Sequence, residues 1–245
     1  PNGEAFYNLT LASRTTVNLT ADEIHNIGLA EVARILEEME AIKQQVGFEG
    51  SLKEFFALTK NDRQFFYPDN DDGRTSYIND TNIFLDAIKA KLPQYFGLLP
   101  RADLVVKRVE AFREQDGGAA HYSSGTPDGS RPGVYYMHLP NMNFSSLNME
   151  STAYHEGNPG HHMQISIAQE LSGVPEFRTQ IFFTAYVEGW GLYAEGLAKE
   201  IGAFENPYMD FGRLTLEVWR AIRLVVDTGI HSKGWSEERA IQYFQ

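Results

Sequence analysis

The sequence contains no cysteine among its 245 residues, and this absence excludes several kinds of site at once. Disulfide bridges, thiolate zinc clusters and cysteine nucleophiles all need a side chain that the chain lacks. Basic residues are in the minority, because 21 lysines and arginines face 33 acidic residues and give a formal net charge of −12. So acidic a chain has no basic stripe that could collect phosphates, and we therefore expect no binding to nucleic acid.

Long apolar runs are also missing, so the sequence predicts no membrane span, and no signal peptide is visible. Hydrophobic residues nevertheless make up 42% of the chain and aromatic residues 13%, which is enough to bury a sizeable core. The chain opens with Pro-Asn-Gly rather than methionine, so we expect a piece of a longer protein. Cytoplasm and export both stay open as its location.

The chain shows no internal repeat, and most of it has helical periodicity. Thr20 and Glu23 have the spacing of a capping box ahead of one periodic run, and Ser236 is placed to cap the last. Helices are predicted over 24–45, 51–60, 77–96, a run from 149 through 155, 177–201, 207–230 and 237–245. Strands are predicted over 102–112 and 133–139, with loops over 61–75 and 117–133. The fold class expected is mainly α with a small antiparallel or mixed sheet, as one domain over 1–245.

The densest group of metal-binding side chains lies at 154–164, in the run YHEGNPGHHMQ. In the motif H-E-x-x-H, histidines at i and i+4 share one helical face and bind one zinc ion, while the glutamate activates a water molecule. Here His155 and His161 are six residues apart, which places them on different faces of a regular helix. An unbroken helix would therefore not bring them together.

A break in the helix resolves this difficulty, because looping out two residues leaves H-E-x-x-H. Gly157, Pro159 and Gly160 are the residue types that permit such a bulge. His162 is the alternative second ligand, since it would share a face with His155 in an unbroken helix. About 10 Å of helical rise would then separate the two rings, which is too far for one ion. The pattern favours His161, with His162 facing the substrate or supporting the site.

A catalytic zinc ion takes three protein ligands and keeps one position open, so a third ligand is needed. Glu188 lies 27 residues after His161 in the run YVEGWGLYAEGL, between two glycines that let a ligand or backbone approach. Its neighbours are mostly aromatic, and a carboxylate in apolar surroundings needs a cation. Glu195, seven residues later, could hold the second nitrogen of a histidine ligand.

These motifs closely resemble the bacterial "domain of unknown function 885" family, whose signature is H-E-x-x-P-G-H-H followed by E-G-W-x-L-Y-A-E. The runs GSRPGVYY and RLVVDTGIHSKGWSEERAIQYF fit as well, so the resemblance covers the chain. The family in turn resembles the gluzincin metallopeptidases, which implies a zincin-like helical catalytic domain forming the C-terminal part of a longer protein. It also implies His155, His161 and Glu188 as zinc ligands and Glu156 as general base. The two-residue insert departs from the gluzincin pattern.

Further candidates follow from what amide hydrolysis requires. The oxyanion that forms needs hydrogen-bond donors, for which the sequence offers His231, Tyr243, Tyr122, Tyr135 and Tyr136. Asp227, one helical turn before His231, could orient or charge that histidine. Arg131, Arg220 and Arg223 could bind a substrate carboxylate. The predicted strand over 133–139 is expected to be an edge strand that pairs with an extended peptide, by analogy with zinc peptidases.

The function expected is therefore a zinc-dependent hydrolase of amide bonds, acting on short peptides. Two histidines and a carboxylate also describe the facial triad of non-haem iron oxygenases, which is the first alternative. Glu156 argues against it, because iron chemistry of that kind needs no general base. The second alternative is a module in which the metal only joins helices.

Overall fold

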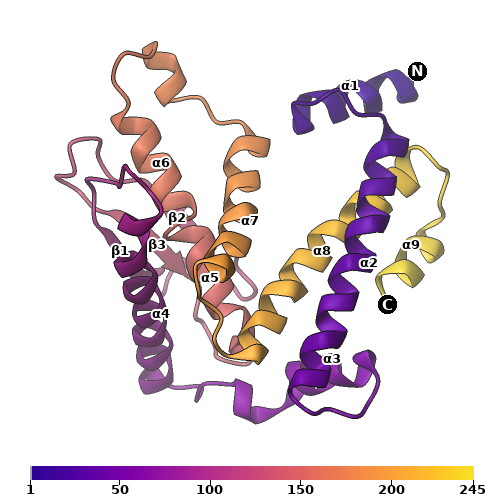
Figure 1. The fold of residues 1–245 in the computed structure, drawn as a ribbon, viewed down its shortest axis with the longest axis horizontal. Coiled ribbons are helices and arrows are strands. Elements are labelled where there is room, and N and C mark those ends of the chain that lie inside the picture. The colour runs from indigo at the N-terminus through magenta and orange to yellow at the C-terminus, as the bar shows by residue number, and fades with distance from the viewer. Residues whose placement is uncertain (1) are drawn as a thin grey trace. The chain divides into compact units, whose positions relative to one another are not determined.

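The computed structural model describes residues 2–245, and they divide into two compact units (Figure 1). One unit comprises Pro1–Leu52 and Arg213–Gln245, and the other is Lys53–Gly212. The single domain expected from the sequence stays a prediction, and each unit is described by itself. The fold class is confirmed, because the chain is mainly helical with one small mixed sheet. None of the helices within residues 2–245 is long and apolar enough to span a membrane, as the sequence predicted.

The first unit is helical. It contains α1 (Gly3–Thr15), α2 (Ala21–Gln45), α8 (Pro207–His231) from residue 213 onward, and α9 (Glu237–Phe244). The capping box on α2 is present: the Thr20 side chain accepts a hydrogen bond from the Glu23 backbone, and the Glu23 side chain accepts one from the Thr20 backbone. Ser236 caps α9 as expected. The helix α1 was not predicted; it buries none of its residues and has no side-chain cap, so the usual sequence signals are missing.

Close packing of α2 against α8 holds this unit together. A Cβ atom on Gly28 would lie 2.8 Å from side-chain atoms of both Leu224 and Val225, so the glycine permits the two helices to approach. Ile35 and Met39 on α2 are fully buried. Burying such side chains contributes roughly 1.5–3 kcal/mol each to the stability of the unit.

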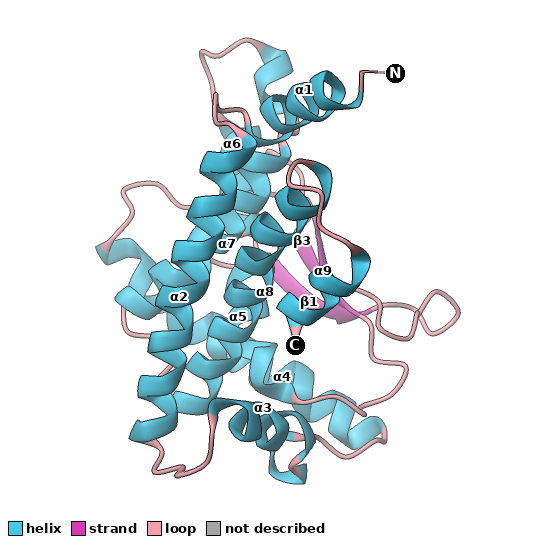
Figure 2. Cartoon of the chain, turned by 90° about the vertical axis from the view of Figure 1, so that its right-hand side faces the viewer, coloured by secondary structure: helices cyan, strands magenta, loops and turns pink. Residues whose placement is uncertain are grey.

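The second unit contains the sheet, drawn in magenta in Figure 2. Its strands are β1 (Leu104–Arg108), β2 (His121–Ser123) and β3 (Gly133–Met137), in the order β1-β3-β2. Strand β3 pairs in parallel with β1 and in antiparallel with β2. The expectation that the strand over 133–139 lies at an edge is therefore wrong, because β3 is central. The edge strands are β1 and β2, and β2 is a three-residue strand inside the predicted loop 117–133.

The helices of this unit are α3 (Leu52–Asn61), α4 (Asp71–Lys91), α5 (Met149–Glu156), α6 (His161–Glu170) and α7 (Thr184–Glu200), and α4 packs directly on β1. Short 3₁₀ turns lie at Arg63–Phe65, Leu92–Gln94, Ser146–Asn148 and Glu176–Thr179. The core between sheet and helices includes Tyr77 and Leu85 of α4, Tyr135 of β3 and Ala153 of α5. Packing against this core places α5, which ends at Glu156, directly beside the sheet.

Two boundaries differ from the prediction. The loop expected over 61–75 is partly helical, because α4 begins at Asp71, where the Asn70 side chain accepts a hydrogen bond from the Gly73 backbone. The helix expected over 177–201 begins only at Thr184. The residues before it form a 3₁₀ turn and an exposed segment rich in aromatic side chains.

Candidate metal centre

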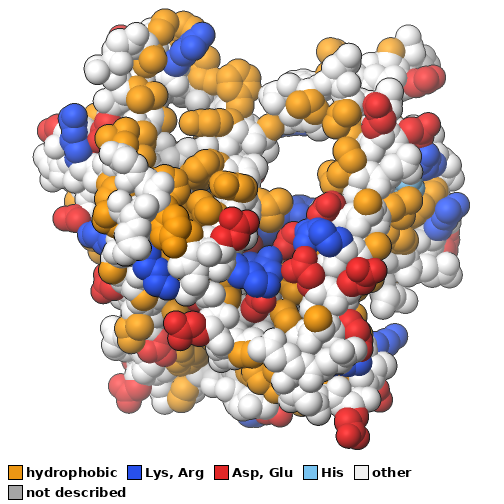
Figure 3. Space-filling view, viewed as in Figure 1, with side chains coloured by type: hydrophobic (Ala, Val, Ile, Leu, Met, Phe, Trp, Pro, Cys, Tyr) orange, Lys and Arg blue, Asp and Glu red, His pale blue; other side chains and the backbone are white. Residues whose placement is uncertain are grey.

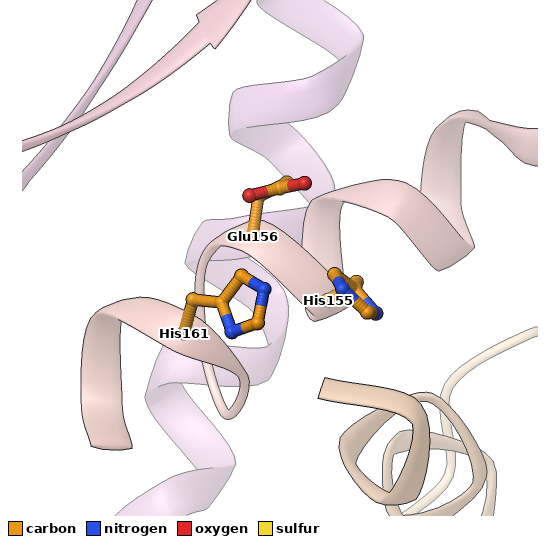
Figure 4. Close-up of side chains that lie close together, drawn as sticks. All are labelled: His155, Glu156 and His161. Carbon is orange, nitrogen blue, oxygen red and sulfur yellow. The ribbon is translucent and has the colours of Figure 1, made fainter. Parts of the chain in front are cut away.

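The helix that carries the motif is broken where the sequence predicted a break. Helix α5 ends at Glu156 and α6 begins at His161, and the residues between them loop out (Figure 4). The Gly157 backbone still donates to the Ala153 carbonyl, at 2.8 Å, and regular bonding resumes where Gln164 donates to the Gly160 carbonyl, at 3.0 Å. The break therefore removes the extra residues from the helical path.

Glycine is required at both ends of this break. A Cβ atom on Gly160 would lie 2.0 Å from the His155 carbonyl oxygen, and one on Gly157 would lie 2.7 Å from the Ala153 carbonyl oxygen. The indole Nε1 of Trp190, on α7, donates to the Pro159 carbonyl oxygen at 2.8 Å. Close backbone packing and this hydrogen bond from a neighbouring helix fix the conformation of the loop.

The break brings the two imidazoles together. The ring centroids of His155 and His161 are 4.5 Å apart and the rings are nearly perpendicular, at 77°. One ligand atom from each of these residues and one from Glu156 all lie within 4.8 Å of one another. Figure 4 shows these three side chains on either side of the break. All three residues are buried. Two imidazoles and a carboxylate thus converge on one small volume.

Glu188, on α7, also lies beside both rings. Its Oε2 is 3.5 Å from His155 Nε2, and its Oε1 is 3.6 Å from His161 Nε2. For a tetrahedral zinc ion with bonds of about 2.0–2.1 Å, neighbouring ligand atoms are about 3.4 Å apart. The two distances from Glu188 to the histidine nitrogens are close to that value. Glu156 lies beside the two histidines. The sequence argument chose Glu188 as a ligand because of its apolar surroundings, and that argument was wrong. The side chain is 53% exposed rather than enclosed by its aromatic neighbours.

Glu195 holds His155 from the other side. Its Oε1 is 2.8 Å from His155 Nδ1, and its Oε2 accepts a hydrogen bond from the Ser151 hydroxyl at 2.7 Å. The carboxylate is buried, so it favours the tautomer with the proton on Nδ1 and leaves Nε2 directed toward Glu188. Ser151 was missed in the sequence, although its position one helical turn before His155 was available as a signal.

The approach of α7 to His155 depends on one glycine. A Cβ atom on Gly191 would lie 2.5 Å from Cε1 and 2.8 Å from Nε2 of His155, whereas one on Gly189 would meet nothing within 4 Å. Both residues are in the same helix, so the pair forms a matched test of this contact.

Gly191→Ala is expected to weaken zinc binding by about 10–100-fold, the range for displacing a group that orients a ligand. Gly189→Ala should bind zinc as the wild type does, since its methyl group meets no neighbour. Titration with zinc against a competing chelator measures both affinities. Equal affinities in the two variants would contradict the contact.

The charges around the histidines favour a cation. Burial raises the pKa of Glu156 to about 7; His155 lowers it, and the Glu188 carboxylate raises it further. Burial lowers the pKa of His155, but hydrogen bonds to Glu188 and Glu195 outweigh this and raise it to about 9. The three carboxylates around the two imidazoles thus favour positive charge at this position.

Glu156 lies beside the edge strand β2. The backbone N–H of Tyr122, in β2, hydrogen-bonds to the Glu156 carboxylate and lowers its pKa. The other strand neighbour is Tyr135, whose pKa is raised well above 10 by burial and further by the Glu156 charge. Among the described residues, Glu156 Oε2 has no hydrogen-bond partner although it is buried. One carboxylate oxygen thus remains available for a water molecule.

The side chain of His162 lies against the sheet rather than beside His155. Its Nδ1 is 3.1 Å from the Tyr122 hydroxyl, and a Cβ atom on Gly133 would lie 2.7 Å from the same nitrogen. The residue is buried, and burial lowers its pKa to about 4, so the ring is neutral. The structure therefore packs His162 against the sheet and leaves His161 beside His155.

Two other predicted residues of this unit lie apart from the cluster. Tyr136 follows Tyr135 on β3 and, because side chains alternate along a strand, occupies the opposite face, where its ring stacks on His121 at 5.3 Å. Its expected role at the site is therefore not supported. Arg131 is exposed in the loop before β3, where its Nη2 donates to the Gly125 carbonyl at 3.4 Å.

The remaining predicted residues lie in the first unit, and their roles at the metal centre stay predictions. Asp227 accepts a hydrogen bond from the Tyr7 hydroxyl at 2.6 Å and lies 4.0 Å from His231 Nε2. Tyr7 was missed because α1 was not predicted. The other three are Arg220 and Arg223, both on α8, and Tyr243, whose ring lies 5.6 Å from that of Trp235.

Comparison with known proteins identifies the family of the chain. A family model described as "Bacterial protein of unknown function (DUF885)" matches residues 1–245. The chain belongs to the DUF885 family. This confirms the family resemblance noted from the motifs; the more distant similarity to gluzincins stays a prediction. None of the curated proteins matches this DUF885 chain.

Two solved structures resemble this DUF885 chain. A "putative lipoprotein" from Colwellia psychrerythraea is 37% identical with a TM-score of 0.91, over 99% of this chain and 42% of that one. A "putative lipoprotein of unknown function" from Shewanella oneidensis is 20% identical with a TM-score of 0.60, over 99% of this chain and 47% of that one. The second likeness concerns the fold alone. The chain spans less than half the length of either protein.

Proposed function

We propose that this DUF885 chain carries the zinc centre of an amide-bond hydrolase that acts on short peptides. One observation carries the proposal: the Glu188 carboxylate lies 3.5 Å from His155 Nε2 and 3.6 Å from His161 Nε2. Ligand atoms of these two histidines and of the buried Glu156 also lie within 4.8 Å of one another. Two nitrogens and a carboxylate oxygen are a donor set found in catalytic zinc sites. The buried Oε2 of Glu156, which has no partner among residues 2–245, further supports the fit.

The residues supply what amide hydrolysis needs. A bound zinc ion lowers the pKa of a water molecule and polarises a carbonyl group. Glu156, buried beside the two imidazoles, would accept a proton from that water and return it to the leaving amine. Strand β2 is an edge strand beside Glu156, so its backbone can pair with an extended peptide.

The metal is tested first. The purified chain is expected to contain about one zinc ion per molecule by elemental analysis, and to cleave peptides from a panel blocked at either end. A chelator should abolish cleavage and added zinc should restore it. Iron in place of zinc would favour the oxygenase, and cleavage that survives complete metal removal would contradict the proposal.

A further inference from the structure

A large apolar groove lies between α6 and α7. Its volume is about 670 Å³, within the roughly 300–1,000 Å³ of ligand sites. We name it the α6–α7 groove, and its main lining residues are Ile165, Leu171, Phe177, Phe182, Phe183 and Tyr186. Half of them come from the 3₁₀ turn and the segment that leads into α7.

The groove is lined by aromatic side chains that remain exposed. Phe177 is 59% exposed, Phe182 64%, Phe183 54% and Tyr186 57%. Figure 3 shows hydrophobic side chains gathered over α6 and the segment before α7, at the upper left. Within the part of the chain that the structure describes, Arg178 is the only charged residue that lines the groove. Contiguous apolar surface of this kind marks a binding site, and its occupant has to be apolar.

The groove adjoins the candidate metal centre. Ile165 lies one helical turn after His161, so both are on the same face of α6. Val187, which also lines the groove, immediately precedes Glu188 on α7. The Gln164 side chain donates to the Tyr186 carbonyl oxygen at 2.8 Å and fixes the two helices to each other there. The groove therefore begins at the two helices that carry two of the three ligands.

We infer that the α6–α7 groove binds a bulky apolar side chain of the peptide, next to the bond that is cleaved. The inference rests on the proposed function and names its substrate class: short peptides with an aromatic or large aliphatic residue at that position. The position of the groove on the two helices that carry His161 and Glu188 favours this occupant over a membrane surface or a second copy of the chain. Among the described residues the lining contains a single cation, Arg178, so attraction to anionic lipid is weak.

Selectivity tests the inference. Two peptides that differ only in phenylalanine or alanine beside the scissile bond are compared as substrates of the full chain. In the double variant Phe177→Ser, Phe182→Ser, kcat/KM for the phenylalanine peptide should fall at least about tenfold relative to the alanine peptide. Phe112→Ser is the matched control, because Phe112 is 87% exposed in the same unit but does not line the groove. It should keep the wild-type selectivity.

Failure of the groove inference and failure of the proposed function give different results. If the wild type cleaves both peptides and the double variant keeps its selectivity, the groove is not a subsite and the proposed function stands. If the wild type cleaves neither, the proposed function fails, and fluorescence anisotropy of a labelled phenylalanine peptide on Glu156→Gln then decides whether the groove binds it. A wild-type dimer that the double variant converts to a monomer, or wild-type binding to neutral vesicles that the variant loses, would overturn the inference.

Discussion

Glu156→Gln is expected to lose peptide hydrolysis by about 10²–10⁴-fold while zinc stays bound, because the amide cannot accept the proton of the attacking water. The substitution keeps the shape of the side chain, and its carbonyl oxygen can still accept the hydrogen bond from the Tyr122 backbone. None of the three proposed ligands is changed. Elemental analysis and kcat/KM on one peptide separate the two effects in a single preparation.

Glu150→Gln is the matched control for this experiment. Glu150 lies on the same helix, is 3% exposed against 7% for Glu156, and also has its pKa raised by burial. Its carboxylate instead accepts hydrogen bonds from the Tyr154 hydroxyl and the Phe204 backbone, both at 2.9 Å or less. Glu150→Gln should keep both zinc and hydrolysis. Hydrolysis by Glu156→Gln at the wild-type rate would contradict its assignment as general base.

Helix periodicity and capping residues made much of the fold predictable. The box formed by Thr20 and Glu23 and the cap at Ser236 depend on neighbours within four residues, so the sequence contains all the information they need. Strand β2 was hidden because three residues in a glycine-rich loop show no alternation, and its pairing with β3 is a long-range contact. The start of α4 at Asp71 had a signal in Asn70, a good N-cap, which the acidic run obscured.

The arrangement of the candidate site was predictable only where it depends on residues close together in the sequence. The break between Glu156 and His161 follows from local residue types, and the sequence predicted it. The contact of Gly191 with His155 and the position of β2 beside Glu156 join segments far apart in the chain, so spacing alone could not show them. Glu188 was chosen for apolar surroundings that turn out to be exposed, and its place between the two rings depends on how α7 packs on α5 and α6.

His161→Ala is expected to remove zinc, whereas His162→Ala is expected to retain it. Nε2 of His161 lies 3.6 Å from Glu188, so its loss leaves one imidazole and one carboxylate for the ion. The affinity should fall by more than the roughly 10–100-fold typical of a residue that only supports a ligand. The Nδ1 of His162 is instead hydrogen-bonded to Tyr122, and its ring packs against the sheet.

The measurement is competitive zinc titration of both variants, with thermal unfolding as a check on the fold. His162→Ala should lower the free energy of unfolding by about 1–3 kcal/mol, because it leaves a cavity and the Tyr122 hydroxyl without its partner. His161→Ala should affect stability less in the zinc-free protein, since its ring faces the site. If His162→Ala lost zinc and His161→Ala kept it, the adjacent imidazole would be the ligand. The bulge would then serve to turn the helix rather than to join its histidines.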